Sequence, residues 1–297
     1  MDVDFYLSDV HVGDFGLVSE EGTTVSRFVL CRRQSSDYTD VGALSVDEDG
    51  DILVARRFKK ELTVFQIEHA MATPIGDVGQ QVWKGALQLA DYVVHNAAHF
   101  TGAAILELGA GTGLASLVAG TLAKRVFSTD VGQSILDICQ RNVSHNLTTL
   151  MRGDDLEILV RELDWTKPFQ ATGAYSWTDS DYQKLKDVSC IIAADVVYDN
   201  SITDAFFQCL VALTTKVAHS VCILISLEKR INFTLENMAP ASPAYQYFRH
   251  CLSREYTDSL GRQLIFSARQ LGADFPQSFE YERVEQLELW ELTVQIC

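Results

Sequence analysis

The sequence predicts an α/β fold, in which a mostly parallel sheet carries helices on both faces. Over about 200 residues after Val82, short apolar runs alternate with segments whose apolar residues recur at helical spacing. Two neighbouring apolar runs, 104–108 and 125–129, lead into a glycine cluster and an aspartate, respectively. Such residues at strand ends are typical of ligand-binding edges in parallel sheets.

Residues 1–66 differ from the rest of the chain. They hold short β-prone runs with turn residues between them, at Phe5–Val12, Arg27–Arg33, Ile52–Phe58 and Leu62–Ile67. No motif with an evident chemistry lies among them. We therefore expect a strand-rich N-terminal extension over 1–66 and one larger domain over 67–297.

The larger domain supplies the alternating elements. Its expected strands are Ala104–Leu108, Arg125–Thr129, Glu157–Leu163, Cys190–Ala194, Val221–Leu227 and Gln286–Val294. Its expected helices run from Val82 to His95 and over Leu114–Ala123, Ser134–Leu147, Thr203–Val217 and Ala244–Arg254. The polar segment 166–187 has no clear period, and we expect it to be a surface insert.

The net charge of the chain indicates which kinds of macromolecule it can bind. The chain has 40 acidic and 24 basic residues, a net charge of −16. Such a chain is a poor general binder of nucleic-acid backbones, so we expect no direct nucleic-acid binding. The charge suits a basic protein partner, or it serves solubility alone. Oligomeric state is not readable from the sequence.

The number and spacing of the cysteines indicate the redox compartment of the protein and whether a metal site is expected. The seven cysteines are scattered singly, with no C-x-x-C pair, which favours free thiols in a reducing compartment. Without paired ligand spacing, and without spaced histidines on a helix, we expect no metal site. The acidic N-terminus does not resemble a signal peptide, and no apolar run is long enough to span a membrane. We expect a nuclear or cytosolic protein that is not secreted.

The glycine cluster suggests a ligand site. It reads Glu107-Leu108-Gly109-Ala110-Gly111-Thr112-Gly113-Leu114, directly after the first strand of the larger domain. Alternate glycines permit a tight turn and a close backbone approach to a ligand. The spacing is G-x-G-x-G, whereas dinucleotide binders carry G-x-G-x-x-G. The shorter loop suits a ligand with a carboxylate where a dinucleotide has its pyrophosphate.

Asp130 ends the next strand. A carboxylate at this position can accept hydrogen bonds from both hydroxyls of a ribose. The alternative is a cap for the helix expected from Ser134. After a glycine loop at this distance we favour the ribose, and with it an adenosine ligand.

Together these motifs resemble the S-adenosylmethionine-dependent methyltransferases with a Rossmann-like seven-stranded sheet. Three further segments resemble the methyltransferase-like family 16 group of protein-lysine methyltransferases: Val82-Trp83-Lys84-Gly85-Ala86, Leu163-Asp164-Trp165 and Asp195-Val196-Val197-Tyr198. Supporting matches are 67–74, 228–235 and Tyr281-Glu282-Arg283. The resemblance covers about residues 67–297 and is less clear in the extension.

The resemblance implies a site for S-adenosyl-L-methionine and its product S-adenosyl-L-homocysteine. The implied cofactor-binding residues are Trp83, Glu107, Gly109, Ala110, Gly111, Thr112, Gly113, Asp130, Leu163, Asp164, Trp165 and Ala194. Within this set the glycine loop and Glu107 face the methionine end, 163–165 flank the adenine, and Trp83 closes the pocket. The alternative for Trp83 and Trp165 is plain packing.

The same resemblance implies that Asp195 and Tyr198 lie where the methyl group is transferred. The alternative is that Asp195 caps a helix and Tyr198 packs. Enzymes of the superfamily that modify adenine or glutamine carry N/D-P-P-Y at this point, and this chain has no proline there. The implied reaction is methylation of the lysine side-chain amine in a non-histone, basic protein, such as one that binds nucleic acid. We also expect the extension to help select that partner.

Other classes of protein share some of these motifs. A nicotinamide oxidoreductase requires the longer glycine spacing and a proton-transfer His or Tyr-Lys pair, which we do not find. A methyltransferase acting on nucleic acid or on a small molecule would keep every cofactor residue and differ only in its acceptor. A methyltransferase fold serving as a non-enzymatic binding module would have lost the glycine loop or Asp195, and both are present.

Overall fold

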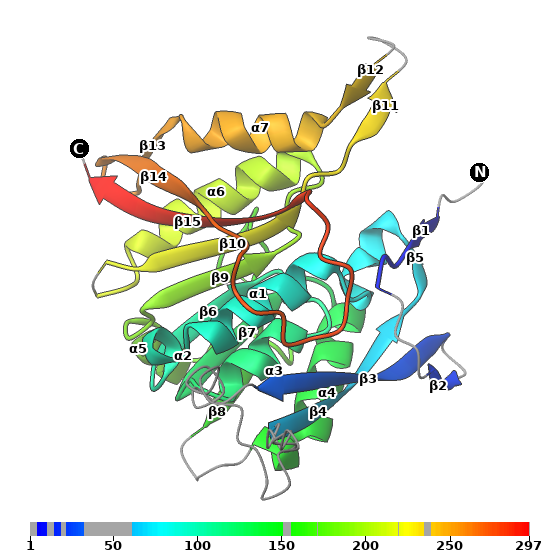
Figure 1. The fold of residues 1–297 in the computed structure, drawn as a ribbon. Coiled ribbons are helices and arrows are strands. Elements are labelled where there is room, and N and C mark those ends of the chain that lie inside the picture. The colour runs from blue at the N-terminus through cyan, green and yellow to red at the C-terminus, as the bar shows by residue number, and fades with distance from the viewer. Residues whose placement is uncertain are drawn as a thin grey trace, which may run out of the picture.

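A computed structural model describes residues 5–10, 15–18, 22–32, 61–150, 156–170, 172–218, 220–234 and 239–296. At its centre lies an eight-stranded sheet, ordered β13-β14-β15-β10-β9-β6-β7-β8 (Figure 1). The strands are β6 (Ala104–Leu108), β7 (Arg125–Asp130), β8 (Glu157–Glu162), β9 (Cys190–Ala194), β10 (Cys222–Glu228), β13 (Glu255–Thr257), β14 (Gln263–Leu271) and β15 (Leu287–Ile296).

The strands from β8 to β10 are parallel, and β15 lies antiparallel between β10 and β14. The six strands predicted by residue range are all present, β14 supplies the seventh that the resemblance implied, and the three-residue β13 adds an eighth at the edge. β13 and β14 were not predicted. In β14 only Leu264 and Phe266 are buried, and the exposed second half of the strand gave no apolar pattern.

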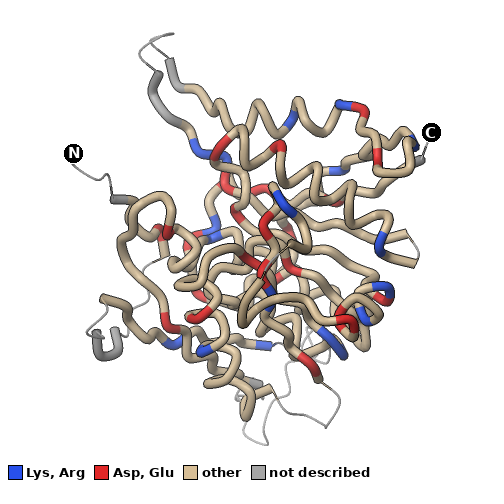
Figure 2. Tube along the Cα trace, turned by 180° about the vertical axis from the view of Figure 1, so that it is seen from behind, with Lys and Arg blue, Asp and Glu red and all other residues tan. Residues whose placement is uncertain are grey.

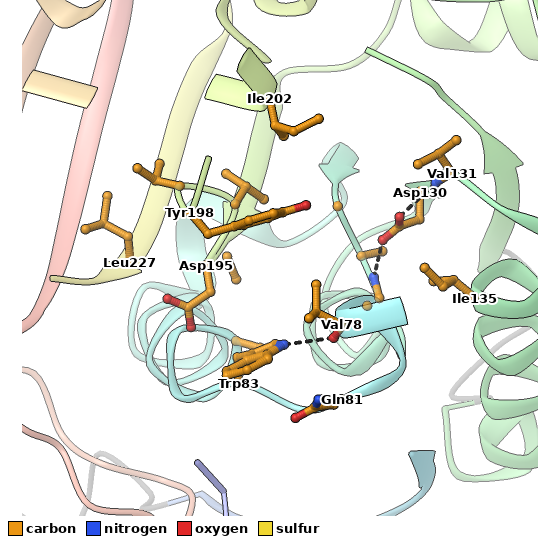
Figure 3. Close-up of a pocket in the computed structure, with 18 of the residues that line it drawn as sticks. Val78, Gln81, Trp83, Asp130, Val131, Ile135, Asp195, Tyr198, Ile202 and Leu227 are labelled. Atoms are coloured by element: carbon orange, nitrogen blue, oxygen red, sulfur yellow. Dashed lines mark hydrogen bonds between the residues drawn. The ribbon is translucent and has the colours of Figure 1, made fainter. Parts of the chain in front are cut away.

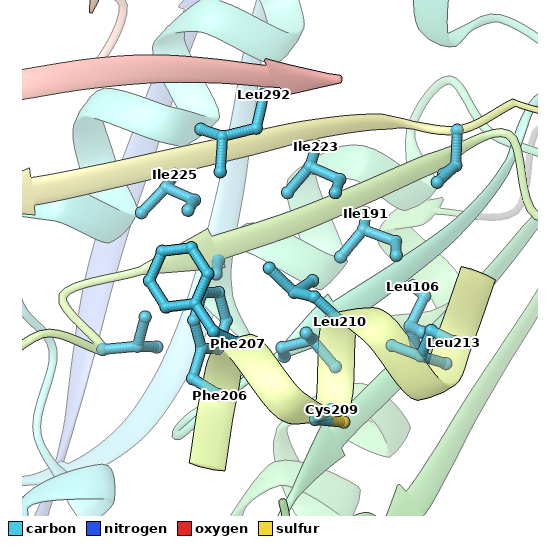
Figure 4. Packing of buried hydrophobic residues seen from close by; sticks show 14 of the residues in the cluster. Leu106, Ile191, Phe206, Phe207, Cys209, Leu210, Leu213, Ile223, Ile225 and Leu292 are labelled. Atoms are coloured by element: carbon cyan, nitrogen blue, oxygen red, sulfur yellow. The ribbon is translucent and has the colours of Figure 1, made fainter. Parts of the chain in front are cut away.

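Helices cover both faces of the sheet. On one face α5 (Asp179–Leu185), α6 (Asn200–Thr214) and α7 (Pro243–Leu252) pack on alternate residues of the central strands. Figure 4 shows this core, with Phe207 and Leu210 of α6 beneath Ile191, Ile223 and Ile225. On the other face lie α1 (Lys84–His95), α2 (Ala97–Phe100), α3 (Leu114–Gly120) and α4 (Gln133–Leu150).

The N-terminal strands pack on these helices. β2 (Phe15–Val18), β3 (Thr23–Arg32) and β4 (Glu61–Ala70) form an antiparallel sheet, and β1 (Phe5–Leu7) pairs with β5 (Ala72–Pro74). Phe28, Leu30, Phe65 and Ile67 are buried in one cluster with residues of α1, α3 and α4. β4 also runs through the expected boundary at 66/67, so the described extension shares its core with the larger domain.

Side-chain amides cover the free edge of β4. Asn142 and Asn146 of α4 are buried, and each exchanges hydrogen bonds with the backbone of β4, at Glu68 and Gln66 respectively. An uncovered strand edge is a template for pairing with another chain. Here two asparagines one helical turn apart take the place of a neighbouring strand. Asn142 also donates to the carbonyl of Thr112 (2.9 Å), which links β4 to the glycine loop.

The segment 166–187 is not the surface insert that the sequence predicted. Trp177 stacks on Phe127 with ring centroids 5.2 Å apart, and Leu185 of α5 is fully buried. Asp181, with Thr178, forms a capping box at the start of α5 and pairs with Arg161 at 2.8 Å. Isolated buried residues between turns carry no periodic signal, which is why the sequence pattern missed them.

The loop before β15 is fixed to α1 through a buried carboxylate. Asp91 has no exposed surface and accepts hydrogen bonds from the backbone of Ser278 and Phe279 and from the Tyr281 hydroxyl. Arg283 pairs with it at 2.5 Å. The Tyr281-Glu282-Arg283 match is thus a packing motif in this structure.

The expected strand Ile52–Phe58 lies outside the described residues. A hairpin of β11 (Asn232–Thr234) and β12 (Ala239–Ala241) follows β10. Among the described residues, no helix combines the length and apolar character that a membrane crossing requires.

Candidate active site

A cavity of about 360 Å³ opens at the carboxyl ends of the parallel strands, where the chain order switches between β6 and β9. Its floor is the glycine loop, and η2 (Ile75–Gln80) and Trp83 close one side (Figure 3). The predicted residues that line it are Trp83, Glu107, Gly109, Ala110, Gly111, Thr112, Asp130, Leu163, Asp164, Trp165, Ala194, Asp195 and Tyr198. The fold therefore brings together all but one of the predicted site residues.

The exception is Gly113. It precedes α3 at φ 81°, and a Cβ there would lie 2.9 Å from the Cys139 sulfur, away from the cavity. Gly113 thus allows close packing against Cys139 of α4, and its place in the cofactor set stays a prediction. Gly109 and Gly111 do line the cavity, at φ 69° and 53°. A Cβ on Gly111 would approach the Gly79 carbonyl oxygen to 2.7 Å, so glycine lets η2 close over the loop.

Asp130 faces this loop and does not cap the following helix. Its carboxylate accepts from the backbone N–H of Gly111 (2.7 Å) and of Val131 (2.8 Å), and α4 begins only at Gln133. Burial raises the pKa of Asp130, and these two N–H donors oppose the shift. Carboxylate oxygens accept more than one hydrogen bond each, so Asp130 retains capacity for a diol.

Glu107 is the buried carboxyl of the site. It ends β6 with 1% of its surface exposed, and Ser116 of α3 donates to it. Burial raises the pKa of Glu107 to about 8, although the hydrogen bond from Ser116 opposes the shift. A nearby positive charge stabilises the ionised form of such a buried carboxyl. The ammonium group of the predicted ligand would supply that charge.

The third strand ends in a surface suited to a flat ring. Leu163 is buried, Asp164 accepts from Thr166 at 2.8 Å, and the Trp165 ring meets Phe206 edge-on at 5.2 Å. Trp165 thus packs as well as lining the cavity. Its indole N–H is buried and has no hydrogen-bond partner among the described residues. A donor left unpaired beside a cavity favours a ligand with an acceptor there.

Together, the unpaired indole, the glycine cradle and the two carboxyls fit S-adenosylmethionine. Trp83 fits its predicted place as well. It lies just before α1, half-buried, and donates from Nε1 to the Val78 carbonyl at 3.0 Å (Figure 3). The Arg230 guanidinium lies 4.5 Å from the centre of its ring. This contact joins η2, α1 and the segment after β10 at the cavity wall.

Asp195 is held in place by three hydrogen bonds to backbone groups. Its carboxylate accepts from the N–H of Gly85 (2.7 Å) and of Glu228 (2.8 Å), and its own N–H donates to Ser226. Its φ of 52° is unusual for a residue other than glycine and costs of order 1–3 kcal/mol. The cap at α6 is Asp199, which accepts from Ile202. Asp195 therefore does not cap that helix.

Tyr198 projects into the cavity from the turn after β9, with 39% of its surface exposed (Figure 3). Burial raises the pKa of Tyr198, and the nearby Asp130 charge adds to the shift. The side chain therefore stays a neutral phenol near pH 7, able to donate a hydrogen bond. It does not pack into the core, the alternative considered from sequence.

Several lining residues were not predicted. They lie in or directly beside β1, η2, α4, the end of β10 and α7: Tyr6, Ile75, Val78, Gly79, Gln81, Val131, Ile135, Glu228, Arg230 and Tyr245. Gln81 donates to the Tyr6 carbonyl and to Thr73, which brings β1 and β5 to the cavity rim. The 67–74 match, which the sequence analysis used only in support of the resemblance, directly precedes η2 and could have pointed to this wall.

Comparison with known proteins assigns the chain to a family. A family model described as "Lysine methyltransferase" matches residues 59–239. The chain belongs to this lysine methyltransferase family. The prediction of an S-adenosylmethionine-dependent protein-lysine methyltransferase is thereby confirmed at the level of the family.

Individual relatives agree with the family. Methyltransferase-like protein 22 of Homo sapiens is 39% identical over 275 residues, 89% of this chain and 68% of that protein. The protein of the same name in Mus musculus is 43% identical over 237 residues, 78% of this chain and 60% of that protein. Protein N-lysine methyltransferase METTL21A of Mus musculus is 27% identical over 193 residues, 63% of this chain and 80% of that protein.

Among solved structures, phosphoethanolamine N-methyltransferase 1 of Haemonchus contortus matches 72% of this chain and 43% of that chain. Its sequence identity is 14% and its TM-score is 0.43.

Proposed function

We propose that this chain methylates the side-chain amine of a lysine that lies in a basic stretch of a protein, such as a nucleic-acid-binding protein. The observation that carries this proposal is the cavity wall after β9 and β10. The carboxyls of Asp195 and Glu228 line it, as do Tyr198 and Tyr245, and Asp9 shares a hydrogen bond with Glu228 from outside the lining.

When bound, S-adenosylmethionine supplies a methyl group on a positively charged sulfonium. The chain must present a neutral amine to it, and at neutral pH only about one free lysine in a thousand is unprotonated. Desolvation in the cavity lowers the lysine pKa. Asp195, fixed by two backbone N–H groups, and the Tyr198 hydroxyl are placed to orient the amine. Alignment of this kind contributes more than a dedicated base would.

Local charge supports a basic substrate. Figure 2 shows acidic and basic residues intermixed along the described trace, so attraction depends on the cavity rim. Asp9 and Glu228 share a hydrogen bond, and burial together with this bond raises the pKa of Asp9. Arg230 lies near Asp195 and partly offsets these charges. The aromatic rings of Tyr198 and Tyr245, which both line the cavity, suit a methylated ammonium.

We also propose that the chain acts in a reducing compartment, the nucleus or the cytosol. Support comes from the thiols, because the six described cysteines are all free: Cys31, Cys139, Cys190, Cys209, Cys222 and Cys251. Tagged chain observed in living cells tests this proposal, and its secretion would contradict it.

The activity is tested by incubating the purified chain with cell extract and S-adenosylmethionine labelled in its methyl group. Duplicate samples are treated with protease or with nuclease. We expect label in a few protein bands, recovered as methyl-lysine. Label that survives protease but not nuclease would instead indicate a nucleic-acid acceptor.

Substrate charge is tested with paired peptides that carry one lysine among arginines or among aspartates. We expect the basic peptide to be preferred, and Glu228→Gln to reduce that preference at least about threefold by weakening the local attraction. Glu282→Gln, at an exposed position, is the matched control. Preference for the acidic peptide would contradict a basic substrate, and no transfer to any lysine would contradict the proposed activity.

A further inference from the structure

Two cysteines and a histidine converge at the edge of the sheet opposite to the cavity. Cys190 begins β9 and Cys222 begins β10, and the two residues are direct partners in the parallel register. His99 reaches them from α2. The two sulfurs and a ring nitrogen all lie within 4.8 Å of one another. From Cys190 to Ala194 at the cavity, β9 covers about 13 Å.

The burial of the three side chains is graded. Cys190 is buried, Cys222 is half-buried and His99 is exposed. The cluster therefore lies partly inside the sheet and is open to solvent on the side of His99. A carboxylate adjoins it, because Oε1 of Glu291 lies 3.7 Å from the Cys222 sulfur. Arg269 pairs with the other oxygen of Glu291 at 2.5 Å and holds that side chain in place.

We propose that Cys190, Cys222 and His99 bind a zinc ion, with a water molecule as the fourth ligand. Two thiolates, one imidazole and one oxygen form a ligand set that tetrahedral zinc accepts. At the usual zinc bond lengths, tetrahedral ligand atoms lie about 3.5–3.8 Å apart. The ligand atoms lie within 4.8 Å of one another, so zinc binding would bring them closer by up to about 1 Å.

Charge also favours a dication here. Two thiolates at a partly buried strand edge would repel each other, and a zinc ion neutralises both. The sequence predicted no metal site, because these ligands lie far apart along the chain and follow no local spacing. Only the register of β9 with β10 and the position of α2 bring them together.

Zinc at this point would join α2 to the first residues of two central strands and would stabilise the folded chain. The simpler account is that both thiols pack as small apolar side chains. The two accounts differ in what the reduced, metal-free chain does when zinc or cobalt is added.

The test uses the full chain, reduced, stripped with a chelator and titrated with Co²⁺, whose visible and near-ultraviolet bands report tetrahedral thiolate ligation. Zn²⁺ is then added in competition, and the melting temperature is measured with and without Zn²⁺. The variants are Cys222→Ser and His99→Ala. Cys31→Ser, which changes another half-buried free thiol outside the cluster, is the matched control.

We expect the wild type and Cys31→Ser to bind one cobalt ion with thiolate bands, to release it to zinc and to melt at a higher temperature with zinc. Cys222→Ser and His99→Ala should each bind at least about tenfold more weakly. The proposal is overturned if the wild type shows no thiolate–cobalt band, or if Cys222→Ser keeps it. Unchanged binding in His99→Ala would overturn the assignment of the nitrogen ligand.

Discussion

Replacing Glu107 by glutamine isolates the effect of a buried carboxyl with almost no change of shape. Burial raises the pKa of Glu107 from 4.5 to about 8, and the side chain is 1% exposed. In the unfolded chain the same carboxyl ionises near its ordinary value. As the pH rises between these two values, the unfolded chain loses a proton that the folded chain keeps.

The direction in which stability changes with pH follows from the linkage between proton binding and folding. A carboxyl whose folded pKa is raised destabilises the fold as the pH rises from the unfolded value to the folded one. Each pH unit in that window corresponds to about 1.4 kcal/mol, so the loss between about pH 5 and about pH 7.5 is about 3 kcal/mol. Glutamine does not titrate. The stability of Glu107→Gln relative to the wild type should therefore increase by about 3 kcal/mol over this range.

The assay is urea unfolding followed by tryptophan fluorescence at several pH values, without cofactor. Glu255→Gln, at an exposed position, serves as the control and should show no such increase. If the stability difference between Glu107→Gln and the wild type stays constant with pH, the carboxyl does not titrate in this window. The assigned burial effect would then be wrong.

The same carboxyl should control cofactor affinity. Since the ammonium of S-adenosylmethionine favours ionised Glu107, affinity should rise with pH up to about 8 and then level off. Calorimetric titration over this range should show the slope in the wild type. It should be absent in Glu107→Gln, and a slope that persisted there would assign the titrating group elsewhere.

Two further predictions concern the loop and the core. Gly111→Ala places a Cβ 2.7 Å from a backbone carbonyl oxygen, so cofactor binding by calorimetry should weaken at least about tenfold. Gly102→Ala, also at positive φ but in open space, should bind normally, and equal weakening in both would point to general backbone strain. Arg283→Ala leaves the buried Asp91 carboxylate without its cation and should cost about 3–5 kcal/mol in urea unfolding. Arg269→Ala, in an exposed pair, should cost about 1 kcal/mol or less, and similar losses in both variants would contradict the burial argument.

The glycine loop and its flanking strands were predictable because their signals are local. Ala104–Leu108 and Cys190–Ala194 have the predicted bounds, since each is a short apolar run ended by a residue that the site needs. Asp130 was assigned to a ribose from its distance after the glycine loop, and that role stays a prediction. The Gly111 N–H bond now shows why that carboxylate faces the loop instead of the helix.

What the sequence could not show depends on contacts between distant segments. Asp195 is a plain aspartate in the sequence, but its positive φ and its bonds to Gly85 and Glu228 exist only once three elements meet. Trp177 lies in a stretch without periodicity, because one ring inserted from a loop leaves no pattern. The sequence pattern placed residues 1–66 in a separate extension because of their short β-prone runs. The buried side chains of that segment nevertheless lie in the core that it shares with the larger domain.

The packing of β3 and β4 against α4 determines how this chain can be shortened. Cutting at residue 66 would remove Val10, Phe28, Leu30 and Phe65, which are all buried. At about 1.5–3 kcal/mol for each large apolar side chain, the loss is comparable to the whole stability of a typical domain. Loss of substrate selectivity in such a fragment would therefore reflect misfolding, not a missing recognition element. A single change at Leu7, which is exposed beside the cavity-lining Tyr6, leaves the core intact and reports on recognition.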